Sequence, residues 1–325
     1  MQNTLLEIRN LHTYFKTDEG IAKAVNGVDL KVPRGETLGL VGESGCGKSV
    51  TALSIMRLVP DPPGKIVNGE IIFDDRDLLQ LSEPQMRHIR GNTVSMIFQE
   101  PMTALNPVYR IGTQMAEVIQ LHQAVGRKEA LSRALDMLSK VGIPDPKQRL
   151  REYPHQISGG MRQRVLIAMA LSSHPKMVIA DEPTTALDVT IQAQILDLMN
   201  ALTAELETSN LLITHDLGVV FEMAQWVAVM YAGQVVEYAS VGDLFGLPLH
   251  PYTVGLMESI PQIDKPISTN KMLKTIPGMV PNLFELADGC SFQDRCKHVL
   301  DRCRRDEPIL LDKGSGHLVR CWLYE

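Results

Sequence analysis

Hydrophobic and polar residues alternate along the first part of this chain with the two-residue period of β-strands. Residues 5–15 and 22–32 predict two such strands, joined by an acidic, glycine-ended turn at 18–20. The short apolar run 37–41 predicts a third strand, which a glycine-rich loop separates from a helix predicted at 49–58. The first part therefore has the order strand, turn, strand, strand, loop, helix.

The second part changes to helical spacing and then returns to strands. Between about 111 and 171 the apolar residues recur at helical intervals, and 191–206 predicts a further amphipathic helix. Four short apolar runs predict strands, at 70–73, 93–98, 177–180 and 211–214. Strands and helices in this order predict an α/β domain, in which we place a helical subdomain at about 100–175.

Length and composition separate a main domain from an appendage. The 325 residues suffice for one large domain plus a small extension. Beyond about residue 241 the composition loosens into proline-containing segments whose apolar content is too thin for a large core. We therefore predict a main domain at 1–240 and a C-terminal extension at 241–325.

Charge and hydropathy exclude several classes of protein. The net charge of −6 gives no general attraction to nucleic acid, and we expect no nucleic-acid partner. No apolar stretch approaches the roughly 18 residues of a membrane helix. The N-terminus lacks the basic and apolar regions of a secretory signal. We expect a cytosolic protein whose role at a membrane, if any, comes through a partner.

The glycine-rich loop at 42–49 has the pattern G-x-x-x-x-G-K-S of a phosphate-binding loop. Gly42 and Gly47 let the backbone fold around a β-phosphate with its N–H groups turned inward. Lys48 reaches the β- and γ-phosphates, and the Ser49 hydroxyl ligates Mg²⁺. The loop follows an apolar strand and opens a helix, as this chemistry requires.

A second phosphate-binding element, Ser158-Gly159-Gly160, stands just before a helical run at 161–171. Unpaired N–H groups and the positive end of the helix dipole suit a γ-phosphate. One nucleotide cannot use both elements of the same subunit. The pattern therefore predicts a complete ATP site built from two protomers.

Carboxylates and other polar residues end three of the predicted strands. Asp181 closes an apolar strand and suits the Mg²⁺ shell, whereas Glu182 suits a general base that polarises the attacking water. His215 follows another strand and suits a γ-phosphate contact. Gln99 closes the strand at 93–98, where it suits Mg²⁺ and the water.

Taken together, these motifs resemble the ATP-binding subunit of an ABC transporter. The matching segments are the Walker A motif at 42–49, the Q-loop Gln99, the signature at 157–161, the Walker B carboxylates Asp181 and Glu182, the D-loop at 186–188 and the H-loop His215. The signature departs from L-S-G-G-Q at Ile157 and Met161, but its Ser-Gly-Gly centre is intact. The resemblance implies a P-loop NTPase cassette with an antiparallel β subdomain, a helical subdomain and a small cysteine-bearing C-terminal extension.

The resemblance also implies the nucleotide contacts. ATP and Mg²⁺ are the expected cofactors, and subunits of this family close head to tail around ATP. Phe15 is the candidate for the aromatic ring that stacks on adenine, with Tyr14 as the alternative. The remaining candidate contacts are Ser44, Gly45, Val50 and Asp188.

Two further segments, 99–107 and 250–253, resemble the oligopeptide/dipeptide permease ATPases. The resemblance implies a related second ATPase subunit, two transmembrane permease subunits, an extracytoplasmic binding protein and a peripheral location on the cytoplasmic face of the inner membrane. The segment after Gln99 would meet the membrane subunits. Nickel, glutathione and oligosaccharide importers belong to the same subfamily, so these cargoes remain alternatives to peptides.

Four of the five cysteines fall near the C-terminus, with the spacing C-x5-C-x6-C-x17-C. They are Cys290, Cys296, Cys303 and Cys321. Four thiolates can hold zinc or an iron–sulfur cluster, and the tight C-x2–4-C pairs of structural zinc sites are missing. The similar permease ATPases carry a tail cysteine set associated with a [4Fe–4S] cluster, which we favour over zinc or incidental thiols. We expect a structural role rather than a redox sensor.

Two rival classes stay open. One is a soluble ABC ATPase that acts on nucleic acid, the ribosome or cluster assembly, although such proteins carry a second cassette or long insertions that this chain lacks. The other is an ATP-binding regulatory module without turnover, against which Glu182 and His215 argue. Nothing in an ATPase of this kind reports the direction of transport, so import is implied by the resemblance alone.

Overall fold

The computed structural model describes residues 4–99, 104–185, 187–259 and 275–325. Contacts divide the chain into two compact units, each built from segments distant in sequence. The first unit comprises Met1–Leu5, Val32–Thr37 and Asp77–Thr214. The second unit comprises Leu6–Lys31, Leu38–Arg76 and His215–Glu325. The cysteine-bearing tail (275–325) and the glycine-rich loop (42–49) thus belong to the same unit.

Three parallel strands form the centre of the first unit: β6 (Val94–Ile97), β7 (Met177–Asp181) and β8 (Ser209–Thr214). Strand β7 lies between the other two, with Ile97 beside Ala180 and Asp181 beside Ile213. Every residue of β7 and β8 is buried, as expected for a parallel sheet covered on both faces. Because the strands are parallel, the residues that follow them meet at one edge.

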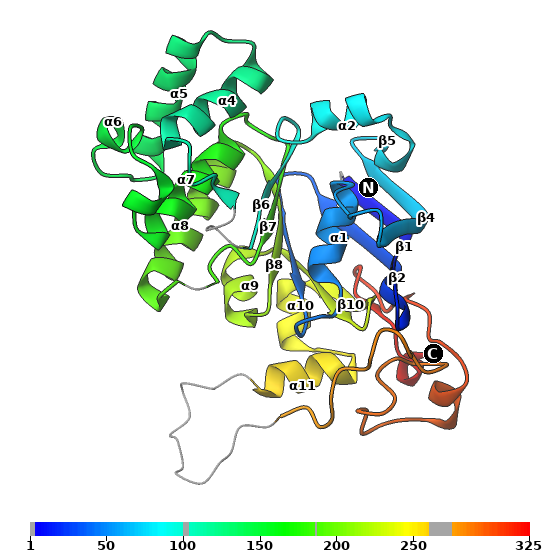
Figure 1. The fold of residues 1–325 in the computed structure, drawn as a ribbon. Coiled ribbons are helices and arrows are strands. Elements are labelled where there is room, and N and C mark those ends of the chain that lie inside the picture. The colour runs from blue at the N-terminus through cyan, green and yellow to red at the C-terminus, as the bar shows by residue number, and fades with distance from the viewer. Residues whose placement is uncertain (1–3, 100–103, 186, 260–274) are drawn as a thin grey trace, which may run out of the picture. The chain divides into compact units, whose positions relative to one another are not determined.

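The first unit also contains the helices that confirm the predicted change to helical spacing (Figure 1). They are α2 (Glu83–Ile89), α4 (Ile111–Gln123), α5 (Arg127–Lys140), α6 (Pro146–Arg149), α7 (Gly159–Leu171) and α8 (Val189–Glu205). Helix α4 buries Ile111, Met115 and Ile119, which recur every fourth residue on one face. That face packs on α5 and α7. Short 3₁₀ turns lie at Leu78–Gln80 and Pro154–Gln156.

The second unit contains two sets of strands. The order β2-β1-β4-β5 forms a four-stranded sheet in which β1 pairs antiparallel with β4, in line with the predicted antiparallel subdomain. Its strands are Gly20–Pro33, Thr4–Thr17, Gly64–Phe73 and Arg76–Asp77. The other set has the order β11-β12-β10-β9-β3. Its strands are Leu311–Asp312, Leu318–Val319, Gln234–Ser240, Trp226–Tyr231 and Thr37–Val41.

The described residues of this unit also form the helices α1 (Lys48–Ile55), α9 (Leu217–Met223), α10 (Val241–Gly246) and α11 (Pro251–Ser259). The tail adds 3₁₀ turns at Asp301–Arg304 and Trp322–Tyr324. In the part of the chain that the structure describes, every helix is too short or too polar to cross a membrane.

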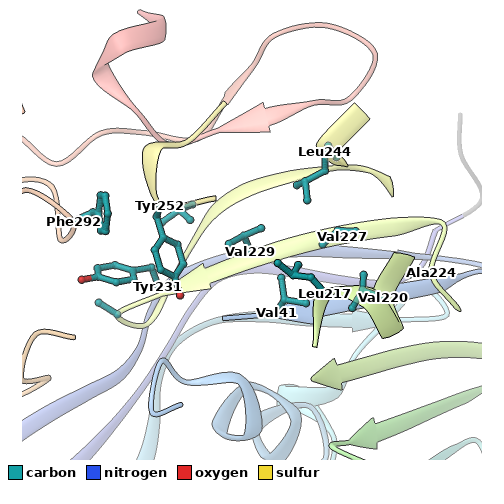
Figure 2. Packing of buried hydrophobic residues seen from close by; sticks show 13 residues of the cluster. Val41, Leu217, Val220, Ala224, Val227, Val229, Tyr231, Leu244, Tyr252 and Phe292 are labelled. Atoms are coloured by element: carbon teal, nitrogen blue, oxygen red, sulfur yellow. The ribbon is translucent and has the colours of Figure 1, made fainter. Parts of the chain in front are cut away.

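One hydrophobic cluster joins the tail to the strands of the second unit. It contains Val229 and Tyr231 of β9 together with Tyr252 of α11 and Phe292 of the tail. Figure 2 shows these three aromatic rings grouped at one end of the cluster, with centroids 4.6–5.5 Å apart. Phe292 of the tail is thus buried against β9, whereas Met279, Leu300, Ile309 and Leu323 of the tail are exposed.

Candidate functional site

The phosphate loop joins β3 to α1 and depends on glycine at two points of close backbone approach. A Cβ at Gly42 would lie 2.2 Å from the carbonyl oxygen of Met230. A Cβ at Gly47, whose φ is 105°, would lie 2.2 Å from the carbonyl oxygen of Ala24. Neither position accepts a side chain, because the facing atoms belong to the backbone.

Lys48 begins α1 and is 5% exposed. Its Nζ donates hydrogen bonds to the carbonyl oxygens of Gly42 (2.7 Å) and Glu43 (3.0 Å), which holds the ammonium group over the loop. Ser44 and Gly45 are exposed at the tip of the loop. Ser49 and Val50 follow in the first turn of the helix, which no side chain caps. An anion at this helix start would meet backbone N–H groups and a fixed cation.

The two aromatic candidates differ in what they contact. The Tyr14 hydroxyl donates to Oδ1 of Asn26 at 2.8 Å and lies 3.0 Å from Nδ1 of His12. The Phe15 ring is half-buried and faces Gly64, where a Cβ would lie 2.6 Å from the ring. Tyr14 is thus part of a polar network. The Phe15 ring carries no polar group, and part of its surface stays accessible.

The predicted carboxylate group forms a hydrogen-bonded cluster at the edge where β6 and β7 end. Oε2 of Glu182 accepts from Nε2 of Gln99 at 3.2 Å and from Oγ1 of Thr185 at 2.8 Å. The structure thereby brings together Gln99 and Glu182, two residues to which the sequence analysis gave separate roles. Thr185 was missed, because a threonine three residues beyond an acid carries no distinctive signal. Asp181 is 5% exposed at the end of β7.

The backbone at Glu182 adopts a left-handed conformation, with φ of 46°. A non-glycine residue in this region costs about 1–2 kcal/mol. The Glu182 N–H donates to the carbonyl oxygen of Ile213 at 2.9 Å, which ties the strained residue to β8. Strain of this kind concentrates at functional positions. Here it turns the carboxylate toward Gln99.

His215 directly follows β8 and is exposed. The next residue, Asp216, caps α9 by accepting from the N–H groups of Gly218 (2.8 Å) and Val219 (3.3 Å). This cap fixes the turn that presents His215.

The second predicted phosphate grip is the start of α7. Ser158 is exposed and caps the helix by accepting from the Met161 N–H at 3.3 Å. The helix begins at Gly159, two residues before the predicted start, so both glycines lie in its first turn. A Cβ at Gly160 would lie 2.9 Å from Cγ2 of Ile191, which requires a small residue beside α8.

Asp188, the D-loop candidate, caps α8. Its exposed carboxylate accepts from the Ile191 N–H at 2.9 Å. This contact gives Asp188 a structural role beside the nucleotide contact that the sequence predicts. The preceding D-loop residue 186 lies outside the described residues, as do residues 100–103 after Gln99.

The four tail cysteines converge. Cys290, Cys296, Cys303 and Cys321 all line one small cavity, and the Cys290 N–H donates to the carbonyl oxygen of Cys303 at 2.8 Å. Burial raises the pKa of the Cys290 thiol to about 12 and also raises those of Cys296 and Cys321. Within the described ranges, three or more histidine, cysteine or acidic side chains nowhere take up the geometry that holds a metal ion. The predicted metal therefore has convergent thiols in its favour but no preformed ion site.

Two family models match the chain. The model of the ABC transporter covers residues 25–185, and that of the oligopeptide/dipeptide transporter C-terminal region covers residues 236–303. The oligopeptide transport ATP-binding protein AppD of Bacillus subtilis is 56% identical over 99% of this chain and 98% of its own length. The chain belongs to the oligopeptide/dipeptide family of ABC transporter ATP-binding proteins. This confirms the resemblance stated from the sequence.

Other relatives agree over the full length of this ATP-binding protein. The probable peptide ABC transporter ATP-binding protein y4tR of Sinorhizobium fredii is 55% identical over 98% of this chain and 94% of its own length. A solved dimeric ABC cassette in a post-hydrolysis state, bound to ADP and Pi, matches 73% of this chain and 98% of its own with a TM-score of 0.65 and 27% identity. The predicted cassette fold is confirmed, and the family's activity is ATP hydrolysis in a transporter.

Proposed function

We propose that this ATP-binding protein energises the uptake of di- and oligopeptides across the cytoplasmic membrane. The observation that carries the proposal is the near end-to-end match to AppD, an oligopeptide transport ATP-binding protein. The match includes the C-terminal region that a separate family model describes for oligopeptide/dipeptide transporters. Residues 1–240 act as the ATP-binding domain in this proposal, and 241–325 as the extension.

The nucleotide roles follow the motifs. Lys48 contacts the β- and γ-phosphates, and Ser49 and Asp181 hold Mg²⁺, with Gln99 next to it. Glu182 acts as the general base toward water, and His215 orients the γ-phosphate. The hydrogen bond from Gln99 to Glu182 supports this assignment, because it links the residue that senses Mg²⁺ to the proposed base. Phe15 stacks on adenine, since its ring is not tied into a polar network as Tyr14 is.

The same motifs place ATP between two subunits. Ser158, at an exposed helix start, offers backbone N–H groups to a γ-phosphate held by a partner's phosphate loop. Asp188, like Ser158, would contact the ATP that the partner's phosphate loop holds. We propose a related rather than identical ATPase subunit as the partner, in a head-to-tail pair that ATP closes and hydrolysis opens.

Membrane subunits receive this motion. We propose two transmembrane permease subunits, fed by an extracytoplasmic binding protein, with the ATPase bound peripherally at the cytoplasmic face of the inner membrane. The described residues just after the Q-loop support a contact surface there, because Val108 and Tyr109 are 71% and 54% exposed. Contiguous exposed apolar patches mark protein–protein interaction sites, and these two adjacent side chains would contribute to such a patch.

We propose further that the four tail cysteines hold a [4Fe–4S] cluster, with zinc as the alternative. Their convergence on one cavity supports a shared ligand. A cluster, whose thiolates bind four separate irons, needs less closely spaced thiols than a single zinc ion does. When bound, the metal group would link the four cysteines and so stabilise the fold of the tail. Anaerobic purification with iron, sulfide and zinc analysis tests this: absence of all three, with Cys290→Ala and Cys296→Ala variants folding normally, rejects the metal.

The transport proposal is tested by copurifying this subunit with its membrane subunits and measuring ATP hydrolysis in vesicles. Peptide-loaded binding protein is expected to stimulate hydrolysis. Stimulation by nickel, glutathione or an oligosaccharide instead of peptide would reject the peptide cargo while leaving the ATPase assignment intact.

A further inference from the structure

An arginine in the cysteine-bearing tail contacts the phosphate loop directly. Nη1 and Nη2 of Arg295 donate to the two carboxylate oxygens of Glu43 at 2.7 and 3.0 Å. Glu43 is the second residue of the Walker A motif, and Arg295 immediately precedes Cys296. The two residues are 252 positions apart in sequence, yet both belong to the second unit. The pair is bidentate, the strongest geometry for arginine with a carboxylate.

Contacts other than the one with Glu43 also hold the Arg295 side chain in place. It is 5% exposed, and its Nε donates to the carbonyl oxygen of Pro277 at 2.9 Å. The guanidinium carbon lies 5.7 Å from the ring centroid of Tyr231 and 5.9 Å from that of Phe292. A guanidinium held in this way loses little further freedom when it binds a carboxylate.

A second bond from the C-terminal part of the chain reaches the same loop residue. The backbone N–H of Glu43 donates to the Tyr252 hydroxyl at 3.0 Å. The carbonyl oxygen of Glu43 in turn accepts from Nζ of Lys48 at 3.0 Å. Glu43 is thus hydrogen-bonded to both Tyr252 and Arg295, and its carbonyl oxygen accepts a hydrogen bond from Lys48. A shift of Glu43 therefore moves one of the carbonyl oxygens that accept hydrogen bonds from the lysine that reaches the phosphates.

We propose that Arg295 is a positioning residue for ATP binding, which fixes the phosphate loop through Glu43 and so makes nucleotide affinity depend on the C-terminal extension. The proposal rests on the proposed role of Lys48 in phosphate binding. The tail would therefore contribute to ATP binding in the ATPase cycle, in addition to its own folding.

A purely electrostatic role for the pair predicts something different. The Glu43 carboxylate places a negative charge in a loop that binds an anion, and Arg295 offsets it. If charge alone mattered, removing the carboxylate would strengthen ATP binding. If positioning matters, removing either partner weakens it, and removing both weakens it no further.

The test is the affinity of the purified full-length protein for mant-ATP with Mg²⁺. Glu43→Gln and Arg295→Gln are each expected to raise the Kd about tenfold, which is 1.4 kcal/mol, and the double variant to match the single ones. Arg295→Lys, which keeps the charge but loses the fork, is expected to recover only part of the affinity. In steady-state hydrolysis the KM for ATP rises while kcat changes less, whereas a smaller folded fraction would lower kcat and leave KM unchanged.

Controls separate the possible failures. Arg302→Gln changes another tail arginine, which pairs with Asp306 and Glu325 and not with the loop, and it is expected to bind mant-ATP like the wild type. If Arg295→Gln does not fold, Tyr252→Phe removes a single oxygen from the same support and is expected to weaken binding about threefold. Unchanged affinity in Glu43→Gln and Tyr252→Phe, or tighter binding by Glu43→Gln, overturns the proposal. Wild-type protein that fails to bind mant-ATP overturns the proposed function instead.

Discussion

Replacing Glu182 by glutamine is expected to separate catalysis from folding. Two hydrogen bonds that the carboxylate accepts, from Gln99 and Thr185, end on the same oxygen, Oε2. A glutamine carbonyl oxygen in that position accepts both, so the local structure is retained. What disappears is the negative charge with which the proposed general base would draw a proton from water. Loss of a general base costs about 10²–10⁴-fold in rate, or roughly 3–5 kcal/mol in the barrier.

The assay is ATP hydrolysis at saturating ATP, together with mant-ATP affinity and the thermal unfolding midpoint. We expect hydrolysis to fall at least a hundredfold, with affinity and unfolding close to wild type, and ATP-bound dimers to accumulate. Glu205→Gln is the matched control, because Glu205 lies in the same unit and pairs with Lys140 in an exposed salt bridge. Turnover of Glu182→Gln above half of the wild-type rate would refute its role as the base.

Three further predictions concern residues whose contacts set the expected size of the effect. Gly47→Ala is expected to abolish mant-ATP binding and lower the unfolding midpoint, because its Cβ would lie 2.2 Å from a backbone oxygen; full binding would contradict this. Ser158→Ala removes the cap of α7 and is expected to cost about 1 kcal/mol in urea unfolding and to weaken ATP-dependent pairing seen by light scattering, while mant-ATP affinity of the isolated chain stays unchanged. Glu237→Ala leaves the His317 ring and the N–H groups of Leu249 and His250 without their buried acceptor, so we expect a loss of about 3–5 kcal/mol in urea unfolding; a loss below 1 kcal/mol would contradict the reading.

The sequence was most informative where local pattern and chemistry agree. The strand 37–41 was predicted to the residue, and the helix after the loop begins one residue before its predicted start, because an apolar run, a glycine motif and a helix start occur in immediate succession; the helix ends at Ile55, three residues before its predicted end. The separate roles of Gln99 and Glu182 were predicted from their positions after apolar strands, whereas the hydrogen bond between them was not predicted. The signature helix starts earlier than predicted, since Ser158 rather than a later residue provides the cap.

Other features depend on contacts between distant segments. The salt bridge of Arg295 with Glu43 has no local signal in the sequence. An acidic residue inside an anion-binding loop is unexpected, however, and indicates that a cation lies nearby. Nor does periodicity show that Tyr252 and Phe292 pack against β9, because the tail's apolar residues are few and irregularly spaced. Such contacts are set by the tertiary fold, which places segments far apart in sequence on one core.

The central claim is that this chain converts ATP hydrolysis into peptide uptake as one half of a two-ATPase transporter. The most direct measurement is the rate of peptide-stimulated ATP hydrolysis in vesicles that contain the partner ATPase and both membrane subunits. The account predicts stimulation by peptide-loaded binding protein that is lost in the Lys48→Ala and Ser158→Arg variants of this chain. Undiminished peptide-stimulated hydrolysis in both variants would contradict the claim.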